Sequence, residues 1–144
     1  MEMGKWKCDD VYLPKQVPLE RWAHKNGQDT TEKVLLAEKT ALHAGQAHSM
    51  VISDRGEMWT CGVADDFRLG GGENNGDQAR LQQVLPFVRE RIATAAAGFI
   101  HSFALTPDGR LYVWGGVTNG RGGLGRERVA KLPTQVAIDY EALF

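Results

Sequence analysis

The feature that most constrains this 144-residue chain is an internal duplication at a constant separation. Residues 44–62 align with residues 97–115 without a gap, and every matched pair lies 53 positions apart. Identical residues recur at matched positions, among them Gly45 and Gly98, His48 and His101, Ser49 and Ser102, Gly56 and Gly109, and Gly62 and Gly115. A fixed period of this length indicates a repeat architecture built from copies of one small supersecondary unit.

Each copy has the pattern of a β-hairpin. In the second copy, β-prone runs at residues 101–106 and 110–115 are joined by Pro107-Asp108-Gly109. Glycine can adopt a positive φ, so it closes such a turn without strain at a Cβ atom. The first copy has the same arrangement at residues 48–53 and 58–62. The duplication therefore predicts two equivalent hairpins and an all-β fold.

A third, fainter copy precedes these two. At the same separation, Trp6 corresponds to Trp59 and Cys8 to Cys61, and the apolar pair at 34–35 corresponds to 87–88. The sequence leaves open whether this is a partial repeat or a chance match.

The combined motif resembles a known repeat. Roughly residues 34–136 resemble the regulator of chromosome condensation repeat. The motifs that carry the resemblance are Gly-x-x-His-Ser, Asp-Gly-x-Leu-Tyr-x-Trp-Gly, Gly-Leu-Gly and Leu-Pro-x-x-Val. The first copy departs from it, because Cys61 stands where tryptophan is usual and Arg68-Leu69-Gly70 replaces Gln-Leu-Gly. The fuller second copy carries Gly98, His101, Ser102, Asp108, Gly109, Trp114, Gly115, Leu124, Gly125 and Pro133.

That family builds β-propellers, usually of seven four-stranded blades with one repeat per blade. The resemblance implies a partial β-propeller of two to three four-stranded antiparallel blades. We expect an irregular segment with a partial blade at residues 1–33, blades at 34–88 and 89–136, and a tail at 137–144.

The strands expected in the first blade lie at 40–44, 48–53, 58–62 and 84–88. Those of the second lie at 92–97, 101–106, 110–115 and 132–136. The polar, glycine-rich stretch 63–82 and residues 116–131 are expected to be connections. Near the N-terminus, residues 11–17 could form a strand interrupted by Pro14. A capping box at 29–32 favours a short helix at about 30–38, whereas the repeat alignment favours a strand near Val34.

Two or three blades cannot close a ring. Propellers protect their strand edges by going full circle, so an open array leaves apolar end faces that aggregate or dock. We therefore expect the apolar faces of the first and last blades to be uncovered, and the chain to act as a fragment or subunit of a larger assembly.

Composition excludes several functions. Lys plus Arg is 17 and Asp plus Glu is 18, which argues against a dedicated nucleic-acid binder or a polybasic membrane anchor. Cys8 and Cys61 are too few for a disulfide framework and are expected to be small buried residues. No secretory signal or membrane span is visible, which favours the cytosol or nucleus and leaves organelle import open.

The residues that could carry catalysis are better explained by structure. A catalytic base would not normally be duplicated with the repeat, and the resemblance implies that His48 and His101 help to hold their blades. Residues 120–125 match Gly-x-Gly-x-x-Gly, but a dinucleotide site needs a helix there, and Pro133 follows eight residues after Gly125.

The acidic residues do not form the pattern of a catalytic pair or of a calcium site. Asp65 and Asp66 are adjacent and would point to opposite faces of a strand, and residues 73–77 lack the spacing of a calcium loop. We expect no catalytic, cofactor or metal site.

A non-enzymatic protein-interaction or scaffold module is therefore the predicted function. The alternatives are a guanine-nucleotide exchange factor for a small GTPase, which is an activity of the family's founding member, and a chromatin-associated module. Tryptophans are favoured at interface centres and a basic run can meet an acidic partner. The candidate partner contacts are Trp6, Trp22, Arg121, Arg126, Arg128 and Lys131.

Overall fold

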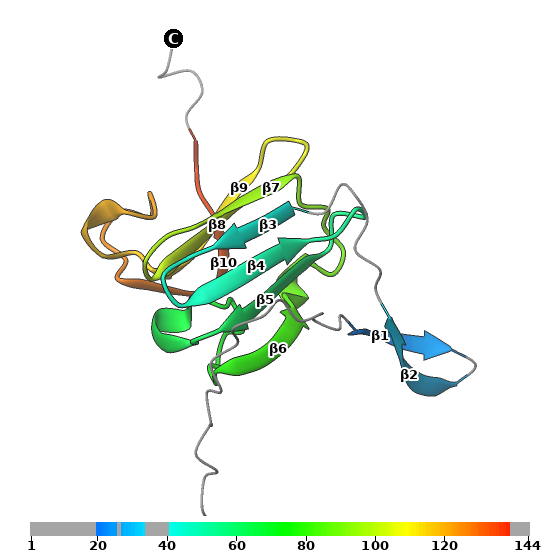
Figure 1. Cartoon of the computed structure of the whole chain (residues 1–144). Helices are drawn as coiled ribbons and strands as arrows, with labels where there is room; N and C mark the ends of the chain where they lie inside the picture. Colours follow the sequence, from blue (N-terminus) through cyan, green and yellow to red (C-terminus); the bar gives the residue numbers. More distant parts are fainter. Residues whose placement is uncertain (1–19, 26, 34–40, 139–144) are drawn as a thin grey trace, which may run out of the picture.

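The structure, a computed structural model, describes residues 20–25, 27–33 and 41–138. Within these ranges the chain forms two four-stranded antiparallel sheets and one two-stranded hairpin (Figure 1). The first sheet contains β3 (Ala41–Ala44), β4 (His48–Ile52), β5 (Met58–Gly62) and β6 (Gln78–Gln83) in that order. The second contains β7 (Thr94–Ala97), β8 (His101–Leu105), β9 (Leu111–Gly116) and β10 (Val129–Gln135). The hairpin joins β1 (Glu20–Lys25) to β2 (Gln28–Lys33).

The two duplicated hairpins have the same register. In the first sheet Met50 is opposite Thr60, and in the second Phe103 is opposite Val113, each 53 positions later. The sheets do not close on themselves, so the expected partial propeller with four-stranded antiparallel blades is confirmed.

The first sheet has two chemically distinct faces. Side chains alternate along a strand, so His48, Met50 and Ile52 share one face of β4 while Ser49 and Val51 share the other. We call the side with the histidine the His face and the side with the serine the Ser face. The His face of the first sheet packs on the second sheet, because His48 lies within hydrogen-bond distance of Ser102.

The second sheet repeats this polarity. Its Ser face, with Ser102 and Ala104 buried, is turned to the first sheet. Its His face, with His101, Phe103 and Leu105 half-buried, is turned away.

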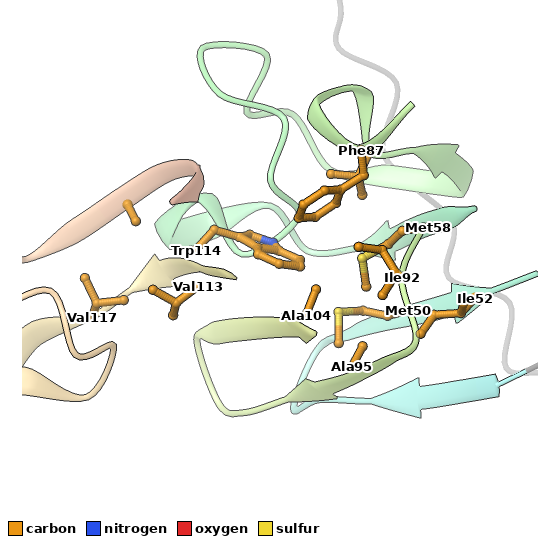
Figure 2. Packing of buried hydrophobic residues seen from close by; sticks show 12 residues of the cluster. Met50, Ile52, Met58, Phe87, Ile92, Ala95, Ala104, Val113, Trp114 and Val117 are labelled. Carbon is orange, nitrogen blue, oxygen red and sulfur yellow. The ribbon is translucent and has the colours of Figure 1, made fainter. Parts of the chain in front are cut away.

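The main core fills the space between the sheets (Figure 2). Phe87 packs edge-on against Tyr112 and Trp114, with ring centroids 5.2 and 5.7 Å apart. Burying large apolar side chains is the dominant favourable contribution to folding, so this contact holds the two blades together. The cluster includes Met50, Ile52 and Met58 of the first sheet and Ala95, Ala104 and Trp114 on the Ser face of the second. It continues to Val113, which is on the His face of the second sheet, opposite Phe103.

The outer strand of the first sheet was expected in the wrong place. The structure has β6 at Gln78–Gln83, of which all but the last residue lies in the stretch 63–82 that was expected to be a connection. Residues 85–87 form the 3₁₀ turn η2 (Leu85–Phe87). Pro86 starts that turn and cannot donate to a strand ladder. In the second sheet β10 begins at Val129, three residues before the expected start, and its register shifts between Ala130 and Thr134, around Pro133.

The structure contradicts one of the two predictions made for the region near residue 30, the short helix at about 30–38. Residues 30–33 lie in β2, so a helix over 30–38 is wrong in its first turn. Trp6, Cys8 and residues 11–17 and 34–38 lie outside the described residues. No helix in the described part of the chain has the length and apolar character needed to cross a membrane.

Two equivalent loops leave the third strand of each sheet. The first contains η1 (Asp65–Phe67) and the second contains η3 (Thr118–Gly120). Positive φ angles recur 53 positions apart in them: Asp66 and Asn119 have φ of 57° and 60°, and Phe67 and Gly120 have φ of 60° and 76°. The duplication therefore extends beyond the hairpins, to loops whose sequences differ.

Candidate functional site

The contact between the two sheets is centred on a main-chain carbonyl. The carbonyl oxygen of Arg68 accepts hydrogen bonds from Trp114 Nε1 at 2.8 Å and from Ser102 Oγ at 3.0 Å. It lies directly after η1, where the left-handed residues turn the chain towards the second sheet. All three partners are buried, so the two bonds act in a low-dielectric setting where losing one is costly.

His48 extends this network from the first sheet. Because the Ser102 hydroxyl proton is donated to Arg68, its oxygen accepts from Nε2–H of His48 at 2.8 Å. This assigns the proton to Nε2 and leaves Nδ1 as a buried acceptor with no hydrogen-bond partner. Burial, then the charges of Arg68 and His101, lower the pKa of His48 to about 4. At neutral pH His48 is therefore a neutral donor.

The side chain of Arg68 is buried in the same loop. Its Nε donates to the Asp65 carbonyl at 2.8 Å, and a terminal nitrogen lies 3.6 Å from the Asp66 carboxylate. A further nitrogen lies 3.5 Å from the carbonyl of Phe99, which belongs to the β7–β8 turn of the next sheet. The guanidinium thus stabilises the loop in the conformation that presents the carbonyl.

The repeated glycines are required by close contacts. A Cβ at Gly62 would lie 2.5 Å from the Ala47 carbonyl oxygen, and the φ of Gly62 is +111°. Gly115 repeats both features against Ile100. Next to the histidines, a Cβ at Gly98 would lie 2.6 Å from the ring of His101.

The remaining motif residues lie at the hairpin turn and beyond it. Asp108 accepts from Thr106, and Arg110 Nε donates to Asp108 at 2.9 Å. The Arg110 guanidinium also pairs with both oxygens of Glu90, at 2.7 and 2.9 Å. Hydrogen bonds from Arg110 lower the pKa of Glu90, and those from Thr106 and Arg110 lower the pKa of Asp108. Gly109 and Gly56 occupy positive-φ turn positions, and Leu124 packs on the core beside Gly125.

The His face of the second sheet is the exposed counterpart of this interface. Met50, Ile52 and Met58 are buried in the first sheet, whereas the side chains 53 positions later are half-buried. These are Phe103, Leu105 and Leu111. Sequence reasoning did not single out these three residues or Arg68 as site residues. The repeat separation applied to Met50, Ile52 and Met58 would have found the three apolar residues.

The Ser face of the first sheet, at the other end of the array, is more covered than expected. On the Ser face of the first sheet Trp59 and Val51 are only 1% and 5% exposed, with Leu81 of β6 packed against them. The expectation that both end faces are uncovered is therefore wrong for these positions. Ser49 on that face is exposed, and Cys61 is half-buried as a free thiol whose pKa is raised by burial.

The residues expected to contact a partner lie in different parts of the structure. Arg126 and Arg128 line one hollow beside η3, and Arg121 is exposed at the end of that turn. Lys131 instead pairs with Glu73 at 2.7 Å and lies over the ring of Phe67. Trp22 is in β1, and Trp6 lies outside the described residues.

No group of three His, Cys, Asp or Glu residues in the described part of the chain could hold a metal ion. The residues that are brought together join the blades: a neutral histidine, a serine, an indole and a carbonyl.

An open array of four-stranded blades, joined by a contact between His48 and Ser102, defines the class of this protein as a partial β-propeller. A family model described as the regulator of chromosome condensation (RCC1) repeat matches residues 92–122. The chain therefore contains an RCC1 repeat.

Similar proteins are much longer than this chain. Human E3 ubiquitin-protein ligase HERC2 is 34% identical over 96 residues, covering 66% of this chain and 2% of HERC2. The mouse regulator of chromosome condensation is 30% identical over 114 residues, covering 73% of this chain and 25% of that protein. Arabidopsis thaliana RUG3, named as a mitochondrial RCC1 domain-containing protein, is 30% identical over 104 residues, covering 72% and 23%.

Solved structures agree with the fold. Yeast RCC1 (Prp20), solved with Kap60, matches with a TM-score of 0.60 and 23% identity, over 75% of this chain and 27% of that one. Human WBSCR16 matches with a TM-score of 0.60 and 22% identity, over 75% and 29%.

Proposed function

We propose that this chain is a non-enzymatic protein–protein interaction module that docks into a larger assembly through the His face of its second sheet. One observation carries the proposal: side chains that are buried in the first sheet have half-buried equivalents in the second. Phe103, Leu105 and Leu111 form an apolar surface of the kind that, in the first sheet, is covered by a neighbouring blade.

The energetics favour occupation of this face. Removing apolar surface from water contributes about 25 cal/mol per Å², so three large side chains that stay partly exposed leave a driving force for association. A blade supplies a matching flat surface, as the second sheet does for the first.

A solvatochromic dye tests the proposal. The isolated chain should bind the dye, and the double variant Phe103→Ser, Leu111→Ser should bind much less. The matched control is Leu42→Ser, because Leu42 is 70% exposed on β3, away from that face. A chain that elutes as a stable monomer, melts cooperatively and binds no dye would contradict the proposal.

Regulation of a small GTPase and chromatin binding are the alternatives. Yeast Prp20p, whose fold this chain shares over 79% of its length with a TM-score of 0.59, was described together with its binding properties to Gsp1p and histones. An exchange assay with labelled nucleotide and salt-dependent nucleosome binding test these alternatives directly. We propose the cytosol or nucleus as the compartment, with a mitochondrial location suggested by the name of RUG3.

A further inference from the structure

We infer that the His face of the second sheet takes a four-stranded blade that presents a serine and a tryptophan at the positions held by Ser102 and Trp114, and that it discriminates against a second copy of this chain. The inference rests on the proposed function and specifies the occupant of the same surface. The surface continues the established interface between the two sheets by one repeat.

The interface inside the chain shows which groups an occupant must supply. The first sheet contributes the Nε2–H of His48 and the carbonyl of Arg68, and the second contributes the hydroxyl of Ser102 and the indole N–H of Trp114. One side therefore offers a ring donor and a carbonyl acceptor, and the other offers a hydroxyl that bridges them and an indole donor.

The second sheet rebuilds the first side of this contact. Arg121 follows η3 with φ of −58° and ψ of −29°, as Arg68 follows η1 with φ of −63° and ψ of −17°. The hydrogen bond from Gly70 N to the Phe67 carbonyl recurs from Gly123 N to the Gly120 carbonyl. The loop therefore presents the Arg121 carbonyl as the first loop presents that of Arg68.

A histidine lies at the matching position, with its ring turned differently. His101 corresponds to His48, and its Nδ1 is likewise buried with no hydrogen-bond partner, but its Nε2 lies beside Gly98, whereas His48 places Nδ1 beside Gly45. Burial and the charge of Arg121 lower the pKa of His101, so its ring is neutral at neutral pH, and a rotation of the ring on docking would direct its N–H to an occupant. Its ring stacks edge-on with Phe103 at 5.4 Å, which orients the ring on the uncovered face.

A second copy of this chain would be a poor occupant. The Ser face of its first sheet presents Ser49, but Cys61 stands where the tryptophan is needed, and a thiol has no N–H to reach the carbonyl of Arg121. Val51 and Trp59 on that face are also already buried. A carbonyl left without its donor on burial costs free energy, which selects against this pairing.

The test adds one blade to the chain. A copy of residues 84–144 joined directly after residue 136 keeps the 53-residue spacing and the link that runs from β6 to β7. We expect one cooperative melt, a Tm raised by about 5 °C or more, and new protection of the β8 amides from hydrogen exchange. Replacing tryptophan by cysteine or serine by alanine in the added blade, or His101→Ala in the original one, should remove at least half of the rise in Tm.

The matched control is Ser49→Ala, which alters the same residue type on the unused face and should leave the rise in Tm unchanged. A separate melt of the added copy, with no increase in the protection of the β8 amides beyond that given by β7 and β9, would overturn the inference. An equal Tm for the tryptophan and cysteine versions would overturn the chemical selectivity. So would a defined dimer of the unextended chain that His101→Ala dissociates. Dye binding by the unextended chain is measured separately, so the proposed function can stand if these results fail.

Discussion

The two His faces have the same design but different surroundings, and the difference shows what a neighbouring blade contributes. In the first sheet, Met50 and Met58 are completely buried and His48 has a hydrogen-bond partner for Nε2. In the second, Phe103 and Leu111 remain half-buried beside His101. Val113 on the same face is already fully buried, with Gly122 of the loop after η3 beside it. A neighbouring blade is therefore needed to complete the burial of Phe103 and Leu111, while the chain's own loop covers Val113.

The largest expected effect comes from removing the indole that joins the sheets. Trp114→Ala should lower the free energy of unfolding by about 3–5 kcal/mol, because it deletes a fully buried ring and a donor to the Arg68 carbonyl. Urea unfolding measures this, with the exposed Leu42→Ala as control. A loss below about 1 kcal/mol would show that the contact between sheets contributes little.

A matched pair of truncations sharpens the comparison. Met58→Ala should cost about 2–5 kcal/mol, whereas Leu111→Ala, at the equivalent position of the second sheet, should cost about 1 kcal/mol. The reason is that Met58 is buried and Leu111 is half-buried. Urea midpoints of both variants check it, and equal losses would indicate that the second His face is already covered.

The two serines give a smaller and equally matched difference. Ser102→Ala should cost about 1–3 kcal/mol, because it leaves His48 Nε2 without its acceptor in a buried site. Ser49→Ala, at an exposed position, should stay within about 0.5 kcal/mol. Thermal melts separate the two, and the reverse order would refute the assigned network.

The smallest effect depends on pH. The folded-state pKa of His48 is lowered to about 4, below the value of about 6.5 expected for the unfolded chain. Above pH 6.5 both states are neutral at this ring and stability is unaffected. Between pH 6.5 and 4 the unfolded chain binds the proton first, so stability falls. The slope of Tm against pH in this window should be flatter in His48→Gln than in the unmodified chain, and should change less in His101→Gln. Equal slopes in the unmodified chain and both variants would contradict the assigned role of His48.

The sequence identified the hairpins and their repeat because glycine, histidine and serine recur at fixed positions. It did not identify β6, since Gln78–Gln83 contains one large apolar residue, Leu81, and shows no alternation. An outer strand with little buried surface has no strong pattern to read. The apolar run after it looked more like a strand, but Pro86 places it in a turn. The blade boundaries at 34–88 and 89–136 stay predictions.

The candidate site was only partly predictable for a related reason. Motif positions such as His48 and Trp114 are visible as letters, whereas their common partner is a carbonyl that every residue possesses. Only the three-dimensional course of the loop after β5 selects Arg68 for that role.

Placing the acceptor on the backbone has an evolutionary consequence. A side-chain acceptor is lost by one substitution, but a peptide oxygen survives any substitution that preserves the local backbone path. Asp66 and Phe67 already differ from Asn119 and Gly120 while the φ angles agree. Adjoining blades can therefore diverge in this loop without losing their attachment, and alignments would undervalue the position that holds them together.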